Sequence, residues 1–582
     1  MTVSTYRVVP EASASGTAPC AEPDQHPLWL LARSPYAQDQ ALARAASPDY
    51  TRWLAHVRPA AGCAHPVRLA GQMFTVARSD DTARVLSHVD TADLPDGVIY
   101  KPCGSRLTSV CPSCAATYQR DAFQLVRAGL LGGKGVPDTV AKHPAVFDTF
   151  TAPSFGPVHT RVVKKHFCTE RRLCVCQPEP CHPDRTAPTC RHGRHRPADQ
   201  RRRTRMACYR RHAATDRRLG SPICPDCYDY PGQVVWNLYS AELWRRTRIG
   251  IERRLRRLAT QRGIDPATVK LAYGKAAEMQ RRAAVHFHAV IRLDGADPAD
   301  REAILPPPAG IGAQDLADIV EQAARATRFS TEPHPARPQG WTIQWGTQLD
   351  QRVIAITGKG QITREQVAGY IAKYATKSTE ATGHVSRRLT DQTIGDYADP
   401  AGDHAARLIH TCWRLGQPPA SVLGRRPASR PVGDPWTCRV CATRTTLSTC
   451  PSCGCIAPWN ASDQPIPAVE DDSASSQYQR LRRCAHRFGY GGHFFTKSRR
   501  YSTTFGVLRA SRVTYRRNPA PTAGPDDDSQ PSTQDTVLQV NFLEFVGAGW
   551  HTAGDALLAN TSAALAREHQ YAAQVEIAAM AA

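Results

Sequence analysis

Two histidines and two tyrosines have the types and spacing most suited to chemistry. His286 and His288 lie in AAVHFHAVIRLDG, an alternating apolar run typical of a β-strand, so both imidazoles should face the same way and can bind one cation. Tyr370 and Tyr374 lie four residues apart in GYIAKYATK, the spacing that puts two side chains on one face of a helix. A phenol beside a cation can attack a phosphodiester, because the cation polarises the phosphorus and the phenol displaces one sugar oxygen.

An acidic side chain and two lysines are expected to complete this site. Glu278 lies eight residues before His286, and a hairpin turn would bring its carboxylate beside both imidazoles. Two histidines and one carboxylate leave open positions and suit Mg²⁺ or Mn²⁺. Lys373 and Lys377 adjoin the tyrosines and are expected to lower a phenol pKa of about 10 or to stabilise the transition state. The structural alternatives are histidines on a solvated sheet face, an acid in solvent, and tyrosines in a core.

The chain has twenty cysteines, and their C-x2-C pairs predict zinc rather than disulfides in a reducing compartment. Cys111 and Cys114 form one pair, which Cys103 and either Cys63 or His65 would complete to a tetrahedral site. The alternative is that Cys63 and Cys103 are small buried apolar residues.

Three further cysteine pairs extend the zinc prediction to two more sites. Cys224 and Cys227 lie in CPDCYDY, and the partners to test first are Cys190, His192, Cys208 and His212. The strongest metal signal is a closed, structural zinc ribbon formed by Cys438, Cys441, Cys450 and Cys453.

The charge balance predicts a polyanionic partner. Lys+Arg number 74 against 52 Asp+Glu, a formal net charge of +22, and the excess is mostly arginine, whose planar fork suits phosphate. A basic surface that only aids solubility is the alternative. The sequence has no apolar run of about eighteen residues and no export signal at its amino terminus, so we expect a cytoplasmic protein with no membrane contact.

Several elements are expected to position these residues. A strand over 145–151 should end at Pro153, and a helix over 363–377 should begin with TREQ, a capping-box pattern. A basic amphipathic helix is expected from VVWNLYSAELW onward, and an alanine-rich helix over 553–582. The basic, aromatic stretch HRFGYGGHFFTKSRRYSTTFGVLRASR has a composition suited to stacking on bases. GGKG at 132–135 should be a turn, because the sequence has no G-x-x-x-x-G-K-[ST] phosphate loop.

The motifs resemble those of HUH-type rolling-circle replication initiators. HFHAVIRL and GYIAKYATK look like the second and third motifs of that family, and FDTFTAPSFG looks like the first. More narrowly, CGSRLTSVCPSC, FTAPSFGPVHTR, CPDCYDY, VHFHAVIRLDG and GHFFTKSRRYSTTFGVLRA are similar to the RepSA-like family of actinobacterial plasmids and integrative conjugative elements. The likeness runs through these motifs in order, from about residue 60 to 570.

The resemblance implies an α/β (α+β) fold, an HUH endonuclease core with a central antiparallel sheet and flanking helices, plus zinc-binding modules. It implies a site- and strand-specific nickase: a tyrosine cuts one strand at the origin, keeps the 5′ end as a phosphotyrosine, and leaves a 3′ hydroxyl to prime synthesis. By position, His286 and His288 match the metal-binding histidines, and Glu278 matches an acidic ligand of some members. Tyr370 and Tyr374 match paired tyrosines that alternate between cleaving and rejoining.

Two details qualify this match. Tyr374 is favoured for the first cut because Lys373 and Lys377 surround it, although in single-tyrosine relatives only one tyrosine matters. Ala283 and Ala284 stand where a glycine is expected in the turn before the histidine strand, so this hairpin is expected to differ from that of the family.

At 582 residues the chain is too long for one core, and we expect several segments. They are an N-terminal helical segment (1–60), a cysteine-containing module (61–135), an HUH core (140–163 and 229–416), a Cys/His-rich zinc-binding insertion (164–228), a zinc ribbon (436–456), a basic aromatic DNA-binding segment (478–517), a disordered linker (518–536) and a C-terminal segment (537–582).

The predicted function is initiation of rolling-circle plasmid replication on DNA that is single-stranded at the nick. Because transesterification needs no ATP, unwinding would require a host helicase, and synthesis a DNA polymerase. Two alternatives stay open: a conjugative relaxase or HUH transposase with the same chemistry, and a non-enzymatic, zinc-dependent DNA-binding regulator.

Overall fold

The computed structural model divides into two compact units, Met1–Asp121 with Gly506–Ala582, and Ala122–Phe505. The parts of the chain that the structure describes are residues 33–79, 82–163, 178–183, 189–190, 206–297, 299–300, 302–354, 363–376, 379, 382, 388–417, 431–437, 444–447, 477–517 and 536–580.

The first unit is built on a four-stranded antiparallel sheet. Strand β1 (Val67–Ser79) pairs with β2 (Thr82–Asp90), with β3 (Ile99–Lys101) and, along nearly its whole length, with β13 (Thr536–Ala548). No strand was expected at β13 from the sequence. This pairing joins the two ends of the chain into one unit.

Four helices belong wholly or mainly to the first unit: α2 (Pro35–Ala45), α3 (Tyr50–Val57), α11 (Phe505–Arg517) and α12 (Ala553–Met580). A small core gathers Trp53 and Val57 of α3 with Tyr100 of β3 and Ala559 of α12. The alanine-rich helix predicted over 553–582 is thus confirmed. Helix α4 (Pro112–Leu131) begins in this unit and ends in the second.

The second unit contains a five-stranded sheet of order β12-β5-β6-β4-β9, antiparallel throughout. Its strands are β4 (Ala145–Phe150), β5 (Val269–Met279), β6 (Val285–Gly295), β9 (Leu349–Val353) and β12 (Phe495–Lys497). Strand β4 confirms the strand predicted from residue 145. A mixed α/β architecture with antiparallel sheets is therefore observed.

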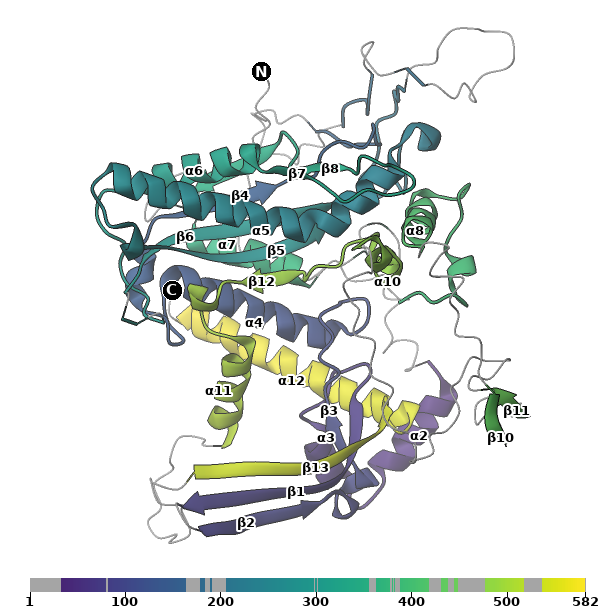
Figure 1. Ribbon diagram of the computed structural model, residues 1–582. Helices are drawn as coiled ribbons and strands as arrows, with labels where there is room; N and C mark the ends of the chain where they lie inside the picture. Colours follow the sequence, from purple (N-terminus) through teal and green to yellow (C-terminus); the bar gives the residue numbers. More distant parts are fainter. Residues whose placement is uncertain are drawn as a thin grey trace. The chain divides into compact units, whose positions relative to one another are not determined.

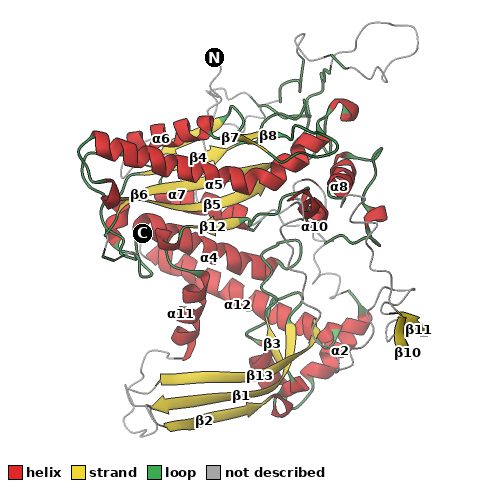
Figure 2. Ribbon diagram, in the orientation of Figure 1, coloured by secondary structure: helices red, strands yellow, loops and turns green. Residues whose placement is uncertain are grey.

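Helices lie on both faces of this sheet. Figure 1 shows α5 (Tyr230–Gln261) and α6 (Ala313–Ala326) across one face, with α7 (Arg364–Ala375) on the other. Figure 2 shows the same layers as helix, strand and helix. Alternate residues of β6 divide between these faces: Phe287, Ile291 and Leu293 join the core with α5 and α6, and His288 faces α7. The capping box predicted at the start of α7 is confirmed by Thr363 and Gln366.

The remaining elements of this unit are short. They are the pairs β7 (Arg328–Ser330) with β8 (Thr342–Gln344) and β10 (Pro431–Thr437) with β11 (Arg444–Leu447), and the helices α8 (His404–Leu415) and α10 (Arg480–Arg483). The predicted turn at 132–135 is confirmed, because Gly133 and Val136 exchange backbone hydrogen bonds. The four cysteines of the predicted ribbon lie outside the described residues, as do Lys377, His192 and residues 518–535 of the predicted linker.

The aromatic segment before α11 departs from expectation. Five of its rings are buried rather than available to bases: at most 3% of any of Tyr478, Phe488, Tyr490, Phe494 and Tyr501 is exposed, whereas Phe495 and Phe505 are half-buried. The reason is that β12 adds to the edge of the sheet beside β5, which carries the flanking rings into the core. Base stacking by these five buried rings is therefore excluded, and DNA binding by segment 478–517 stays a prediction.

Gly129 of α4 is a tightly packed position. A Cβ atom there would lie 2.4 Å from the ring of the buried Tyr501. We expect Gly129→Ala to lower the free energy of unfolding by about 1–3 kcal/mol, because the ring must move. Gly369→Ala in α7 is the matched control, since nothing lies within 4 Å of a Cβ there. The control should gain up to about 1 kcal/mol. Urea unfolding followed by circular dichroism measures both, and equal midpoints for Gly129→Ala and wild type would contradict this packing.

Asp148 of β4 is a fully buried carboxyl on the α6 side of the sheet. Gln351 donates a hydrogen bond from Nε2 to its Oδ1 over 2.8 Å, and within the described part of the chain Oδ2 has no partner. Burial raises the pKa of Asp148 to about 8. The folded chain therefore keeps a proton on this carboxyl at pH 7, where the unfolded chain has lost it.

The stability of the protein should therefore depend on pH through Asp148. Between the unfolded pKa of 3.8 and the folded value of about 8, the native state binds more protons, so stability falls as pH rises. Relative to Asp148→Asn, the wild type should lose about 1 kcal/mol per pH unit over this range. Urea midpoints at pH 5, 6.5 and 8 check this. Parallel pH profiles for the two proteins would show that Asp148 is ionised in the native state.

Candidate functional site

The β5–β6 hairpin brings Glu278 and His288 into contact, but with His286 they do not form a group whose ligand atoms all lie within 4.8 Å of one another. Antiparallel pairing places Glu278 opposite His286 and Ala276 opposite His288. Nε2 of His288 lies 2.9 Å from Oε2 of Glu278, and its Nδ1 lies 3.1 Å from Oγ1 of Thr149 on β4. A carboxylate and an imidazole nitrogen at this separation can serve as neighbouring ligands of one hard cation, with Thr149 fixing the ring. Sequence reasoning missed Thr149, which lies within the predicted strand and first motif.

His286 faces the same side of the hairpin, and its ring centroid lies 6.3 Å from that of His288. Its Nε2 is buried and has no hydrogen-bond partner within the described residues. Burial holds the pKa of His286 well below its ordinary range, and the nearby His288 and Arg282 add to the effect. A neutral imidazole with a buried free nitrogen is a ready metal donor, because buried polar groups normally have partners.

The two tyrosines of α7 pack on His288. The ring of Tyr374 stacks on His288 with centroids 4.7 Å apart, and Tyr370 meets the same imidazole edge-on at 5.1 Å. The two hydroxyls lie 3.3 Å apart. Phe147 of β4 makes an edge-to-face ring contact with Tyr370. The imidazoles and phenols therefore share one face of the sheet, as the nickase prediction requires.

Protein groups make the phenols less acidic here. Burial, and next the charge of Glu278, raise the pKa of Tyr374, and burial raises that of Tyr370. Lys373 is exposed, and no hydrogen bond joins it to either hydroxyl in the described structure. The groups that shift the pKa of the two phenols do not include this lysine.

The turn between β5 and β6 uses an alanine where a glycine was expected. Ala283 adopts φ +62°, a left-handed conformation that costs a residue with a Cβ about 1–2 kcal/mol. Asn237 of α5 holds the turn by donating from Nδ2 to the carbonyl of Ala283 and accepting from the amide of Val285. Gln233 donates to the carbonyl of Arg282. Buried polar side chains of α5 thus supply the support that glycine would have made unnecessary.

A cluster of four thiols forms in the first unit. Sγ of Cys63 lies 3.9 Å from that of Cys111 and 3.7 Å from that of Cys114, and Cys103 lies 3.7 Å from Cys114. Four thiolates on one zinc ion are about 3.8 Å apart, since Zn–S is about 2.3 Å. The amides of Ala64 and Cys103 donate to two of the sulfurs. This group can bind zinc, and Cys63 rather than His65 completes it.

In the second unit, the predicted partners of Cys224 and Cys227 lie in two separate groups. Cys190 joins this pair, with sulfur separations of 3.4 Å to Cys224 and 3.7 Å to Cys227. Cys208 and His212 instead form another group with His159 and Cys181. Of the partners to test first, Cys190 is therefore confirmed beside Cys224 and Cys227, whereas Cys208 and His212 belong to the other group and His192 lies outside the described residues.

Similarity to known proteins assigns the family. Residues 49–564 match the sequence model of the RepSA family, described as "Replication initiator protein, pSAM2". A replication initiator protein of Streptomyces ambofaciens is 36% identical over 532 residues, which cover 89% of this chain and 91% of that protein. The chain belongs to the RepSA replication initiator family. No solved structure matches this RepSA-family chain. Its described part contains no helix long and apolar enough to cross a membrane.

The four-thiol group gives a direct test. Cys114→Ser should lower the zinc content of this RepSA-family protein by about one equivalent, because a structural site with three thiolates binds zinc far less tightly. Mass spectrometry of metals on dialysed protein measures the loss. Cys484→Ser replaces a buried cysteine outside the three groups and should keep the full content. A Cys114→Ser protein with wild-type zinc would show that these thiols hold no metal.

Proposed function

We propose that this protein initiates rolling-circle replication by cutting and rejoining one DNA strand through a 5′-phosphotyrosine. The observation that carries the proposal is the stacking of Tyr374 and the edge contact of Tyr370 on His288. Family membership supports replication initiation and DNA binding, and the side-chain geometry supports the chemistry. The antiparallel sheet with helices on both faces supports an HUH endonuclease core.

His286, His288 and Glu278 would hold a divalent cation, Mg²⁺ or Mn²⁺. The buried, unpartnered Nε2 of His286 and the adjoining Glu278 carboxylate fit a cation of this kind. When bound, such an ion acts as a Lewis acid on the phosphodiester. Thr149 would keep His288 in one orientation, because its hydroxyl meets the ring nitrogen on the far side from Glu278.

The reaction that we propose forms one phosphoester bond and breaks one. The phenol oxygen of Tyr374 attacks phosphorus, the bond from phosphorus to the 3′ oxygen breaks, and the proton of the phenol passes in net terms to that 3′ oxygen. Because the number of ester bonds is unchanged, no nucleotide triphosphate is needed. The hydroxyl of Tyr370, 3.3 Å from that of Tyr374, offers a first acceptor for the proton.

Two tyrosines on one helix face allow two successive cuts. While one phenol holds the 5′ phosphate, the other can attack the next junction, and the released 3′ hydroxyl rejoins the strand. We assign the first cut to Tyr374, which stacks on His288. Lys373 and Lys377 adjoin it in sequence and are assigned to stabilising phosphate charge.

The proposed partners follow from this chemistry. The substrate is the replication origin, single-stranded at the nick, and the basic balance of the chain favours phosphate. A host helicase would supply unwinding and a DNA polymerase would extend the 3′ hydroxyl. The zinc groups and the ribbon predicted at Cys438, Cys441, Cys450 and Cys453 would have structural roles.

A nicking assay tests the proposal. Purified protein, Mg²⁺ and supercoiled plasmid carrying the candidate origin should give nicked plasmid with the 5′ end bound to protein. We expect His288→Ala and Tyr374→Phe to lower the nicking rate by at least about a hundredfold, because a ligand or the nucleophile is lost. Tyr273→Phe is the matched control, since Tyr273 lies on β5 and packs on Trp244 of α5. It should nick at the wild-type rate.

The outcomes separate the alternatives. If wild type and His288→Ala bind the origin equally and neither cuts, the protein is a DNA-binding regulator and the proposal is wrong. If nicking occurs but a minimal plasmid bearing only this gene and its adjacent origin does not replicate, the protein is a relaxase or transposase.

A further inference from the structure

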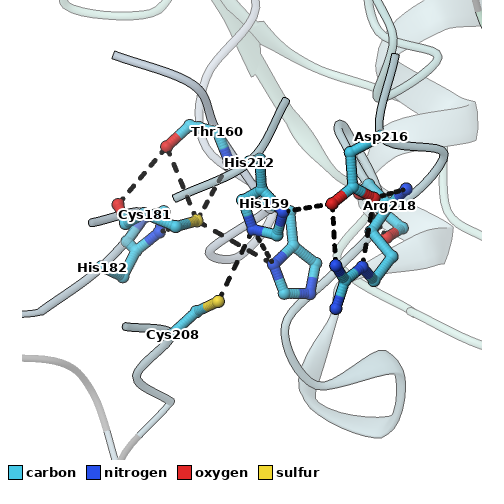
Figure 3. A network of polar contacts seen from close by, with 9 residues as sticks. His159, Thr160, Cys181, His182, Cys208, His212, Asp216 and Arg218 are labelled. Carbon is cyan, nitrogen blue, oxygen red and sulfur yellow. Dashed lines mark hydrogen bonds and ion pairs between the residues drawn. The ribbon is translucent and has the colours of Figure 1, made fainter. Parts of the chain in front are cut away.

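Four side chains from distant segments of the second unit converge in the Cys/His-rich region. His159, Cys181, Cys208 and His212 each offer one nitrogen or sulfur atom, and these atoms all lie within 4.8 Å of one another. Figure 3 shows the two imidazoles and two thiols turned toward a common centre. Nδ1 of His182 lies 3.1 Å from Sγ of Cys181. His212 is almost fully buried.

The separations match those of ligands around one tetrahedral zinc ion. With Zn–N near 2.05 Å and Zn–S near 2.3 Å, two nitrogens lie about 3.3 Å apart, and a nitrogen and a sulfur about 3.6 Å apart. Nδ1 of His159 lies 3.2 Å from Nε2 of His212. Sγ of Cys208 lies 3.6 Å from Nε2 of His212, and Sγ of Cys181 lies 3.9 Å from Nδ1 of His159.

The surrounding hydrogen bonds orient the ligands as metal sites require. Oδ2 of Asp216 lies 2.7 Å from Nδ1 of His212, which places the ring proton there and leaves the Nε2 lone pair toward the centre. Arg218 holds Asp216 through its guanidinium group and its backbone amide. The amide of Thr160 donates to Sγ of Cys181 over 3.1 Å, and such donors stabilise a thiolate.

Scattered backbone hydrogen bonds hold the described part of this segment together. Its described residues contain isolated bridges, Val158 with Pro222 and His182 with Cys208, in place of extended strands. Small modules without a sizeable core commonly depend on a metal ion for their fold. A site closed by four protein ligands has no open position for substrate, so its role is structural.

We propose that His159, Cys181, Cys208 and His212 bind one structural zinc ion, with Asp216 as the positioning residue of His212. Binding would release the protons of the two thiols, because thiolates are the ligands. His159 lies immediately after the strand and turn of the first motif, and the other ligands lie within the Cys/His-rich insertion. The ion would therefore fasten the insertion to the core.

The loop fastened by this ion contacts the hairpin of the candidate nicking site. Arg281, in the β5–β6 turn, donates to the carbonyl of Ala214 over 3.0 Å. Gly220 lies so close that a Cβ atom would meet the backbone of Arg281 at 2.5 Å. We therefore expect the zinc ion to steady the turn between Glu278 and His286. This consequence rests on the proposed function, whereas the metal site does not.

Zinc content of the full-length protein tests the site without DNA. Cys208→Ser and His212→Ala should each lose about one equivalent of zinc, because three ligands remain. Cys484→Ser, at a buried cysteine outside the three groups, is the matched control and should keep all of it. Wild-type zinc content in both ligand variants would overturn the site. So would peptide mapping that finds a Cys181–Cys208 disulfide in zinc-loaded wild type.

Asp216→Asn keeps all four proposed ligands. It therefore tests the site even if the ligand variants fail to fold. Loss of an outer-shell carboxylate typically weakens metal binding by about 10- to 100-fold. One zinc equivalent should therefore pass to a chelator at about tenfold lower chelator concentration than in wild type, and trypsin should then cut at Arg217 and Arg218. Unchanged zinc transfer would overturn the assignment of Asp216.

Nicking by Asp216→Asn separates this inference from the proposed function. Excess zinc should restore nicking to within about twofold of wild type, because the site refills by mass action. Zinc loss with no effect on nicking would refute the contact with the hairpin but leave the metal site. If wild type itself does not nick, the proposed function fails while the zinc measurements still stand.

Discussion

The register of strands β4, β6 and β5 is the constraint on which the candidate site depends. Strand side chains alternate between faces, so a slip of one residue would turn both histidines toward α5 and put Phe287 against α7. The burial of Phe287, Ile291 and Leu293 beneath α5 and α6 fixes the register. The same register sets Glu278 opposite His286 and Thr149 opposite His288. Hydrophobic burial on one face thus aligns the polar groups on the other.

Two features of the β5–β6 hairpin lower the stability of the fold. Nε2 of His286 is buried without a partner in the described structure, and Ala283 takes a left-handed conformation. Asn237 stabilises the turn through hydrogen bonds to both sides of it. Such costs are typical of sites arranged in advance for a ligand. Both features are consistent with a cation that binds at the unpartnered Nε2 of His286.

Local pattern predicted much of this structure. Alternation predicted the histidine strand, four-residue spacing placed both tyrosines on one helix face, and TREQ marked the start of α7. Local sequence pattern could not predict contacts between distant segments. The pairing of β13 with β1, the role of Asn237, and the division of cysteines and histidines between two groups depend on tertiary packing. The base-stacking prediction failed for Phe488 and Tyr490, which are buried, because an aromatic composition is the same in a core and on a binding surface.

The location of the covalent adduct tests the central claim most directly. Origin DNA should be cleaved by wild-type protein, digested with nuclease, and the protein cut with trypsin. Trypsin cleaves after Lys373 and so separates the two tyrosines, leaving Tyr370 in EQVAGYIAK and Tyr374 in YATK. The account predicts a nucleotide mass on YATK after the first cut. An adduct on neither peptide, with nicking intact, would contradict it.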